Sequence, residues 1–170
     1  MPAILSLALA FSAVCAERSS SRQAQTASTE HRVKPLDEAG LKTLLEAQKG
    51  HIVILNFWAT WCEPCREEFP ELLRVHEDYR RRGVVLIFLS LDEPDESEAV
   101  EHFLEKHKVS LTSYIRSEED LDPLINLVDP DWVGALPSTF LFDREGKRVE
   151  TLLGSINYET VVKFVEPLMQ

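Results

Sequence analysis

The stretch from residue 52 to residue 70 constrains this chain more than any other. It begins with the run Ile-Val-Ile-Leu-Asn-Phe-Trp over residues 52–58, which is nearly all apolar. A strand that is buried on both faces has this composition. Two cysteines, Cys62 and Cys65, follow at once, and beyond them the apolar residues recur at helical spacing. The sequence therefore predicts a buried strand, a short turn, and a helix whose first turn carries a Cys-x-x-Cys pair.

The position of this pair at the start of a helix has a chemical consequence. The first backbone N–H groups of a helix lack partners and the helix dipole places partial positive charge there, so a thiolate is favoured. The thiolate is the nucleophile of thiol–disulfide exchange. We expect Cys62 to be the exposed attacking thiol and Cys65, shielded above the same turn, to resolve a mixed disulfide. Pro64 suits an early helical position because its missing N–H is not needed there.

A Cys-x-x-Cys pair also occurs as half of a zinc site or as a structural disulfide. A zinc site with four ligands needs a second pair of ligands. The other cysteine, Cys15, lies in an apolar leader, and the histidines show no convincing paired spacing. A structural disulfide that closes so short a loop would stabilise the fold poorly. We therefore expect a redox-active pair with no metal and no cofactor.

The residues around the pair resemble a known family. The string FWATWCEPC at residues 57–65, followed by EFP at residues 68–70, is similar to the thioredoxin superfamily and, more closely, to its TlpA/ResA-type membrane-anchored or periplasmic branch. The resemblance extends from about Leu36 to the C-terminus. It implies an α/β, thioredoxin-like fold, in which helices flank a central mixed sheet, with an N-terminal extension and an αβ insertion over residues 110–131.

The rest of the chain predicts elements that fit such a fold. Strands are expected at residues 32–36, 52–58, 84–91 and 113–116, directly after Pro137, and at 148–153. Helices are expected from Asp37 to about Gly50, from the cysteine pair to about Gly83, around residues 100–107, near 121–127, and after Asn157. The second buried strand should lie parallel to the first, and the last two strands should form an antiparallel hairpin.

Pro137 precedes a predicted strand, a position at which a proline can hold a cis peptide bond. The resemblance implies a cis-proline here that packs against the cysteine pair and shapes the substrate groove. It also implies substrate contacts from Trp61, Glu63 and Pro64 beside the cysteines. The alternative for Pro137 is an ordinary proline that begins a strand.

Glu68 is the candidate proton carrier. Many thioredoxins have a buried Asp six residues before the first cysteine, but Asn56 occupies that position here and cannot carry a proton. The ResA-like branch instead has a Glu three residues after the second cysteine, and Glu68 matches it. Helical spacing places Glu68 one turn from Cys65, where a shielded carboxylate would have a raised pKa and could exchange a proton with the thiol. The alternative is a solvated glutamate like Glu67.

The N-terminal residues predict export. Residues 2–16 form an apolar run that is too short to span a bilayer and ends in a small-residue cleavage site, although no Lys or Arg precedes it. We expect residues 1–16 to be a signal peptide or, if Cys15 is lipidated, a lipoprotein leader. Residues 17–31 are expected to be a disordered tether and 32–170 the thioredoxin-like domain. The expected location is the periplasm or the outer face of the cell membrane.

These observations predict a thiol–disulfide oxidoreductase that reduces disulfides of envelope proteins, with cytochrome c maturation as the role that the resemblance suggests. The expected partners are protein disulfide or dithiol substrates and a membrane electron donor of the thioredoxin-reductant type, and the protein is expected to be a monomer. A formal net charge of −11 argues against a nucleic-acid partner. The alternative is a non-catalytic thioredoxin-fold binding or metal-chaperone module. The intact cysteine pair, with Trp61, Glu68 and Pro137, argues against it.

Overall fold

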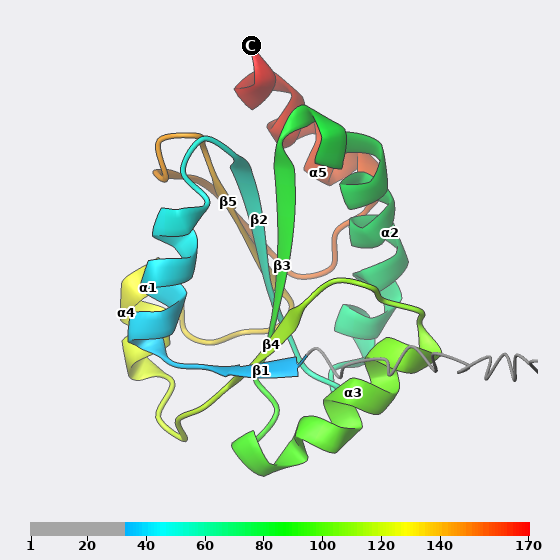
Figure 1. The fold of residues 1–170 in the computed structure, drawn as a ribbon, viewed down its shortest axis with the longest axis vertical. Coiled ribbons are helices and arrows are strands. Elements are labelled where there is room, and N and C mark those ends of the chain that lie inside the picture. The colour runs from blue at the N-terminus through cyan, green and yellow to red at the C-terminus, as the bar shows by residue number, and fades with distance from the viewer. Residues whose placement is uncertain (1–32) are drawn as a thin grey trace, which may run out of the picture. The chain divides into compact units, whose positions relative to one another are not determined.

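Strand β2 (Ile52–Trp58) lies inside a six-stranded sheet and is buried along its whole length. The structure is a computed structural model that describes residues 33–170. The predicted leader, Cys15 and the predicted tether lie outside the described residues. Helices cover both faces of the sheet, as Figure 1 shows, with α1 and α4 on one face and α2 and α5 on the other.

The elements predicted from the sequence are all present. The other strands are β1 (Val33–Leu36), β3 (Val84–Ser90), β4 (Ser113–Arg116), β5 (Ser138–Phe142) and β6 (Arg148–Leu153). The helices are α1 (Glu38–Ala47), α2 (Glu63–Tyr79), α3 (Ser97–Lys106), α4 (Asp122–Val128) and α5 (Tyr158–Val165). A short 3₁₀ turn at Pro94–Glu96 lies between β3 and α3. The mixed sheet and the αβ insertion that carries β4 and α4 are therefore confirmed.

The strand order is β1-β4-β3-β2-β5-β6. The first four strands in this order run parallel to one another. Strand β5 runs antiparallel to β2, and β6 runs antiparallel to β5. Phe57 of β2 is paired with Ser138 of β5. Continuing this register by one residue places Pro137 level with Trp58, at the end of β2 from which the cysteine-containing turn leaves.

The side chains of β2 alternate between two cores, because successive residues of a strand point to opposite faces. Val53, Leu55 and Phe57 belong to the core under α1 and α4. Ile52, Ile54 and Trp58 belong to the core under α2, α3 and α5. Asn56 therefore falls on the α2 face of the sheet, as the one polar residue of an apolar strand.

Aromatic rings join α2 to the sheet. The ring of Phe69 on α2 stacks on Phe88 of β3 with 4.0 Å between centroids, and it also contacts Trp58 and Phe103. All these rings are buried. Burial of a large aromatic side chain contributes on the order of 2–3 kcal/mol, so this cluster fixes the helix that carries the cysteines against the sheet.

Asp37 and Asn157, where two helices were expected to begin, are the N-caps of α1 and α5. The Asp37 side chain accepts a hydrogen bond from the Gly40 N–H at 2.7 Å, and the Asn157 side chain accepts one from Thr160 at 2.9 Å. Such caps satisfy N–H groups that have no partner within the helix. None of the helices in residues 33–170 combines the length and the apolar character needed to cross a membrane.

Candidate active site

Cys62 and Cys65 form a disulfide at the N-terminus of α2, with 5.3 Å between their Cα atoms. Cys62 is the N-cap residue, and its Sγ accepts a hydrogen bond from the Cys65 N–H at 3.3 Å. Pro64 lies in the first turn, as expected. The first turn therefore directs a backbone donor and the positive end of the helix dipole at the sulfur of Cys62.

The accessibility of the two cysteines differs less than the sequence predicted. Cys62 was expected to be exposed, but in the disulfide form only 6% of the residue is accessible, and Cys65 is fully buried. The expectation that Cys62 is exposed is therefore wrong for the disulfide form, whereas Cys65 is shielded as expected. Trp61, by contrast, is 66% exposed directly beside the disulfide.

Glu68 lies inside the protein and not on its surface. It is 2% exposed, whereas Glu67 next to it is exposed, so the solvated alternative does not describe Glu68. One carboxylate oxygen accepts a hydrogen bond from Asn56 Nδ2 at 2.8 Å, and the other accepts one from the Ile156 N–H at 3.1 Å. The carboxylate is therefore held from β2 on one side and from the loop before α5 on the other.

Burial raises the pKa of Glu68 from 4.5 to about 7. The two hydrogen bonds, from Ile156 and Asn56, act in the opposite direction because they stabilise the charged form, but they do not outweigh desolvation. A carboxyl group with a pKa near neutrality can both take and give a proton under physiological conditions.

Asn56 has a contact that sequence reasoning missed. Its amide cannot carry a proton, but its Nδ2 donates to Glu68 and also to Thr139 Oγ1 at 2.9 Å. Alternation along β2 could have shown that Asn56 faces α2. The identity of its partners depends on the pairing of β2 with β5, which no local pattern contains.

The peptide bond between Leu136 and Pro137 is cis, as predicted. Trp61, Glu63 and Pro64 are all exposed around the disulfide, and Glu63 forms an ion pair with Arg66 at 3.1 Å. The structure thus brings the cysteines, Trp61 and Pro137 to one end of β2.

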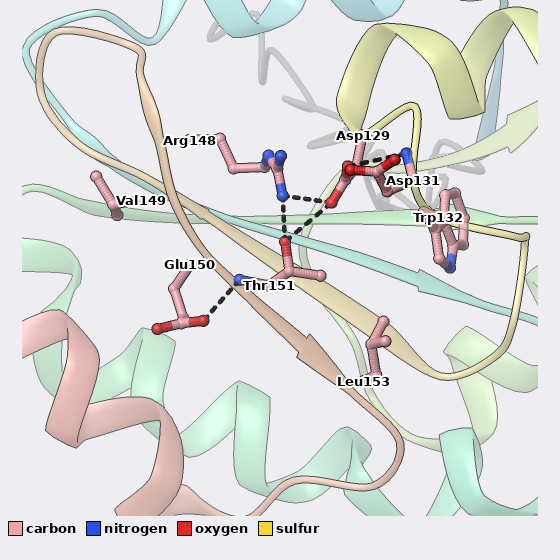
Figure 2. A pocket seen from close by; sticks show the side chains of 8 residues that line it. All are labelled: Asp129, Asp131, Trp132, Arg148, Val149, Glu150, Thr151 and Leu153. Atoms are coloured by element: carbon pink, nitrogen blue, oxygen red, sulfur yellow. Dashed lines mark hydrogen bonds and ion pairs between the residues drawn. The ribbon is translucent and has the colours of Figure 1, made fainter.

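A groove runs beside strand β6, with a volume of about 490 Å³. Figure 2 shows that the side chains of Arg148 and Thr151 point toward Asp129, with which both interact. Leu153, at the end of β6, is 63% exposed. The next residue, Gly154, donates its N–H to the Pro137 carbonyl at 2.9 Å. Leu153, which lines the groove, is therefore adjacent in the chain to the residue that bonds the cis-proline.

Within residues 33–170, no group of three or more His, Cys, Asp or Glu side chains could hold a metal ion.

Comparison with known proteins identifies the family. The model of the AhpC/TSA family matches residues 21–150. This chain belongs to the AhpC/TSA family. Among its family relatives is the thiol–disulfide oxidoreductase ResA of Bacillus thuringiensis (strain Al Hakam), which is 33% identical over 132 residues, covering 78% of this chain and 72% of the relative. The ResA protein of Bacillus subtilis (strain 168) is 32% identical over 120 residues, covering 71% of this chain and 63% of the relative.

Solved structures show the same fold. A structure of a putative thiol:disulfide interchange protein DsbE from Chlorobium tepidum superposes with a TM-score of 0.63 at 26% identity, covering 74% of this chain and 85% of that one. The thioredoxin domain of a thiol–disulfide oxidoreductase from Bacteroides vulgatus gives 0.58 at 27% identity, covering 71% and 84%. This AhpC/TSA family member is thus a thiol–disulfide oxidoreductase with a thioredoxin-like fold, which favours the enzyme over the non-catalytic alternative.

The raised pKa of Glu68 predicts how the stability of the oxidised protein depends on pH. The folded state keeps this proton at pH values where the unfolded chain has released it. The resulting contribution to stability is fully present below pH 4.5 and is lost as the pH rises through about 7. Its size is about 3 kcal/mol in the free energy of unfolding. Urea unfolding at a series of pH values measures it.

Glu68→Gln should remove this loss of stability between about pH 4.5 and 7, because a glutamine does not titrate. Glu67→Gln is the matched control: the same change at the exposed neighbour should leave the wild-type dependence intact. If wild type and Glu68→Gln have parallel profiles through this range, the carboxyl group of Glu68 ionises as it does in the unfolded chain.

Proposed function

We propose that Cys62 is the attacking thiol of this oxidoreductase, that Cys65 resolves the mixed disulfide, and that Glu68 exchanges the proton of Cys65. The observation that carries the proposal is that all three lie at the N-terminal end of α2. Cys62 caps the helix, Cys65 lies in its first turn, and Glu68 lies one turn further on and is buried with Cys65.

The chemistry transfers two electrons to the substrate. The Cys62 thiolate attacks one sulfur of a substrate disulfide, so that a mixed disulfide forms and one substrate thiolate leaves. Cys65 then loses its proton, and its thiolate attacks the Cys62 sulfur. The Cys62–Cys65 disulfide forms, and the second substrate thiolate is released. A donor dithiol returns the pair to the reduced state by the reverse exchange.

Glu68 would accept the proton that Cys65 must lose before it attacks the mixed disulfide. A buried thiol such as Cys65 ionises reluctantly, because burial disfavours the charged thiolate. A carboxylate one turn away, with a pKa of about 7, has the proton affinity to accept the thiol's proton. Asn56 supports this role by fixing the orientation of the carboxylate through its hydrogen bond to Oε1.

We infer that the substrates are disulfide-containing proteins of the cell envelope, apocytochrome c among them, and that a membrane dithiol protein of the thioredoxin-reductant type supplies electrons. Trp61, Glu63, Pro64 and Pro137 would contact the substrate. Their exposure around the disulfide, or in the case of Pro137 its position at the same end of β2, supports this assignment. The protein would act as a monomer outside the cytoplasm, delivered by residues 1–16.

Replacing Cys65 by Ala should trap the first intermediate. Without a resolving thiol, a covalent mixed disulfide between Cys62 and an oxidised protein substrate such as insulin should accumulate. Non-reducing electrophoresis and mass spectrometry of the cross-linked peptides measure it. Cys62→Ala is the control and should trap none. Faster alkylation of Cys65 than of Cys62 in the reduced wild-type protein would reverse the two roles.

Replacing Glu68 by Gln should slow the resolving step. The change keeps the shape of the side chain and removes its titration. General-base catalysis contributes about 100- to 10,000-fold in enzymes, but thiol exchange keeps much intrinsic reactivity, so we expect a loss of roughly tenfold in insulin reduction at neutral pH. The measurement is the pH profile of thiol alkylation and of insulin reduction.

Glu67→Gln is again the control for general effects of charge at the start of α2. Profiles of wild type and Glu68→Gln that superimpose between about pH 5 and 9 would exclude Glu68 as the proton acceptor of Cys65.

The proposed location predicts a processed N-terminus. In fractionated cells we expect the protein outside the cytoplasm, with the leader of residues 1–16 removed. N-terminal sequencing and mass spectrometry of the isolated protein measure this. A mature chain that begins at Cys15 and carries lipid would support the lipoprotein alternative. A full-length protein in the cytoplasm that begins at Met1 would rule out both forms of export.

A further inference from the structure

A second buried carboxylate, that of Asp92, lies beside the turn that leads to Cys62. Asp92 follows β3 by two residues and is fully buried. The carboxyl ends of the parallel strands β2 and β3 lie side by side, since Trp58 pairs with Ser90. Asp92 therefore contacts the turn that follows β2, although the two segments are far apart in the sequence.

The carboxylate of Asp92 accepts hydrogen bonds from this turn and from β3. It accepts hydrogen bonds from the backbone N–H of Thr60, at 2.9 Å and 3.2 Å to its two oxygens. It also accepts hydrogen bonds from the hydroxyl groups of Thr60 and Ser90. Three donors therefore converge on one buried carboxylate, and two of them belong to Thr60.

Thr60 is the second residue of the turn that positions Cys62. The turn is closed by a hydrogen bond from the Cys62 N–H to the Ala59 carbonyl at 3.1 Å. Cys62 then caps α2, so the path from the Asp92 carboxylate to the reactive sulfur contains only the turn itself. A shift of Thr60 would move the Cys62 sulfur relative to the N–H groups of the first turn of α2.

The side chain of Arg116 holds the backbone of Asp92 from the other side. Arg116 ends β4, lies in the αβ insertion and is 4% exposed. Its Nε donates to the carbonyls of Leu91 and Asp92, both at 3.1 Å. Its terminal nitrogens bind the Glu93 carboxylate and the carbonyls of residues 118 and 119. A planar guanidinium with five donors suits such a set of acceptors, whereas a lysine ammonium does not.

We propose that Asp92, fixed by Arg116, is a positioning residue that holds Thr60 and thereby sets the placement of the Cys62 sulfur at the N-terminus of α2. The side chain of Arg116 thus links the αβ insertion to the reactive turn. This inference rests on the proposed role of Cys62 as the attacking thiol. We call Asp92, Thr60 and Arg116 the Asp92 network. The network affects the reactivity of Cys62 and does not contact the substrate.

The test is the pH profile of Cys62 alkylation in the reduced full-length chain, followed by peptide mass spectrometry. Thr60→Val removes the hydroxyl donor and keeps the shape of the side chain. It leaves Asp92, Glu63 and Glu68 in place, so a shifted profile reports a displaced sulfur and not a changed charge. We expect alkylation at neutral pH to slow by roughly three- to tenfold, the equivalent of one hydrogen bond, with the profile shifted to higher pH.

Two matched variants separate this effect from a general loss of stability. Thr60→Ser keeps the hydroxyl donor and should restore the wild-type profile. Thr43→Val makes the same substitution on α1, where the threonine hydroxyl bonds the Ala39 carbonyl on the exposed surface, and it should leave the profile unchanged. If Thr60→Val is folded and its profile superimposes on that of the wild type, the inference is wrong.

Arg116→Lys tests the network from the insertion and should shift the profile in the same direction. The double variant Thr60→Val with Arg116→Lys should shift it no further than the larger of the two single changes, because both act through Asp92. Additive shifts would show that Arg116 acts by another route. Preferential alkylation of Cys65 in the wild type would instead contradict the proposed function, so the two failures are distinguishable.

Discussion

Burial of β2 on both faces is the constraint on which the rest of the structure depends. Each face of this strand carries large apolar side chains, and each must be covered by helices to remove them from water. The cover on one face includes α2, which starts after the short turn that follows the strand. Because a rigid, buried strand and a packed helix hold the two ends of this turn, the Cys62–Cys65 disulfide occupies a defined place at the helix N-terminus.

Glu68, on the buried face of α2, shows that an ionisable group inside the protein lowers stability when it is charged. Desolvation raises its pKa to about 7, although an amide and a backbone N–H both donate to the carboxylate. A glutamine at this position would not carry the loss of stability that ionisation brings as the pH rises. The proposed role in proton exchange with Cys65 gives that cost a function. It also accounts for Asn56, whose amide orients the carboxylate from the central strand.

In the proposed mechanism, two buried carboxylates serve the two cysteines in different ways. Glu68 acts through its proton and serves Cys65. The carboxylate oxygens of Asp92 accept hydrogen bonds from Thr60, which positions Cys62. This division places proton exchange and sulfur placement on separate side chains, from the helix and from the end of β3 respectively. Arg116 of the αβ insertion holds the backbone of Asp92. In this mechanism the insertion therefore affects the reactivity of Cys62, although the cysteine-containing turn lies outside it.

The sequence by itself determined the features that follow from local periodicity and from a short motif. These are the strand before the cysteines, their position at a helix start, the spacing that puts Glu68 one turn from Cys65, and the caps of α1 and α5. Only the tertiary structure decided how far Cys62 is buried and which groups hold Asn56, Glu68 and Asp92. The reason is physical: those partners lie on strands and loops distant in the sequence. Their contacts depend on the order and register of the strands. The hydrophobic pattern of the sequence restricts both, but it does not specify which polar atoms come into contact.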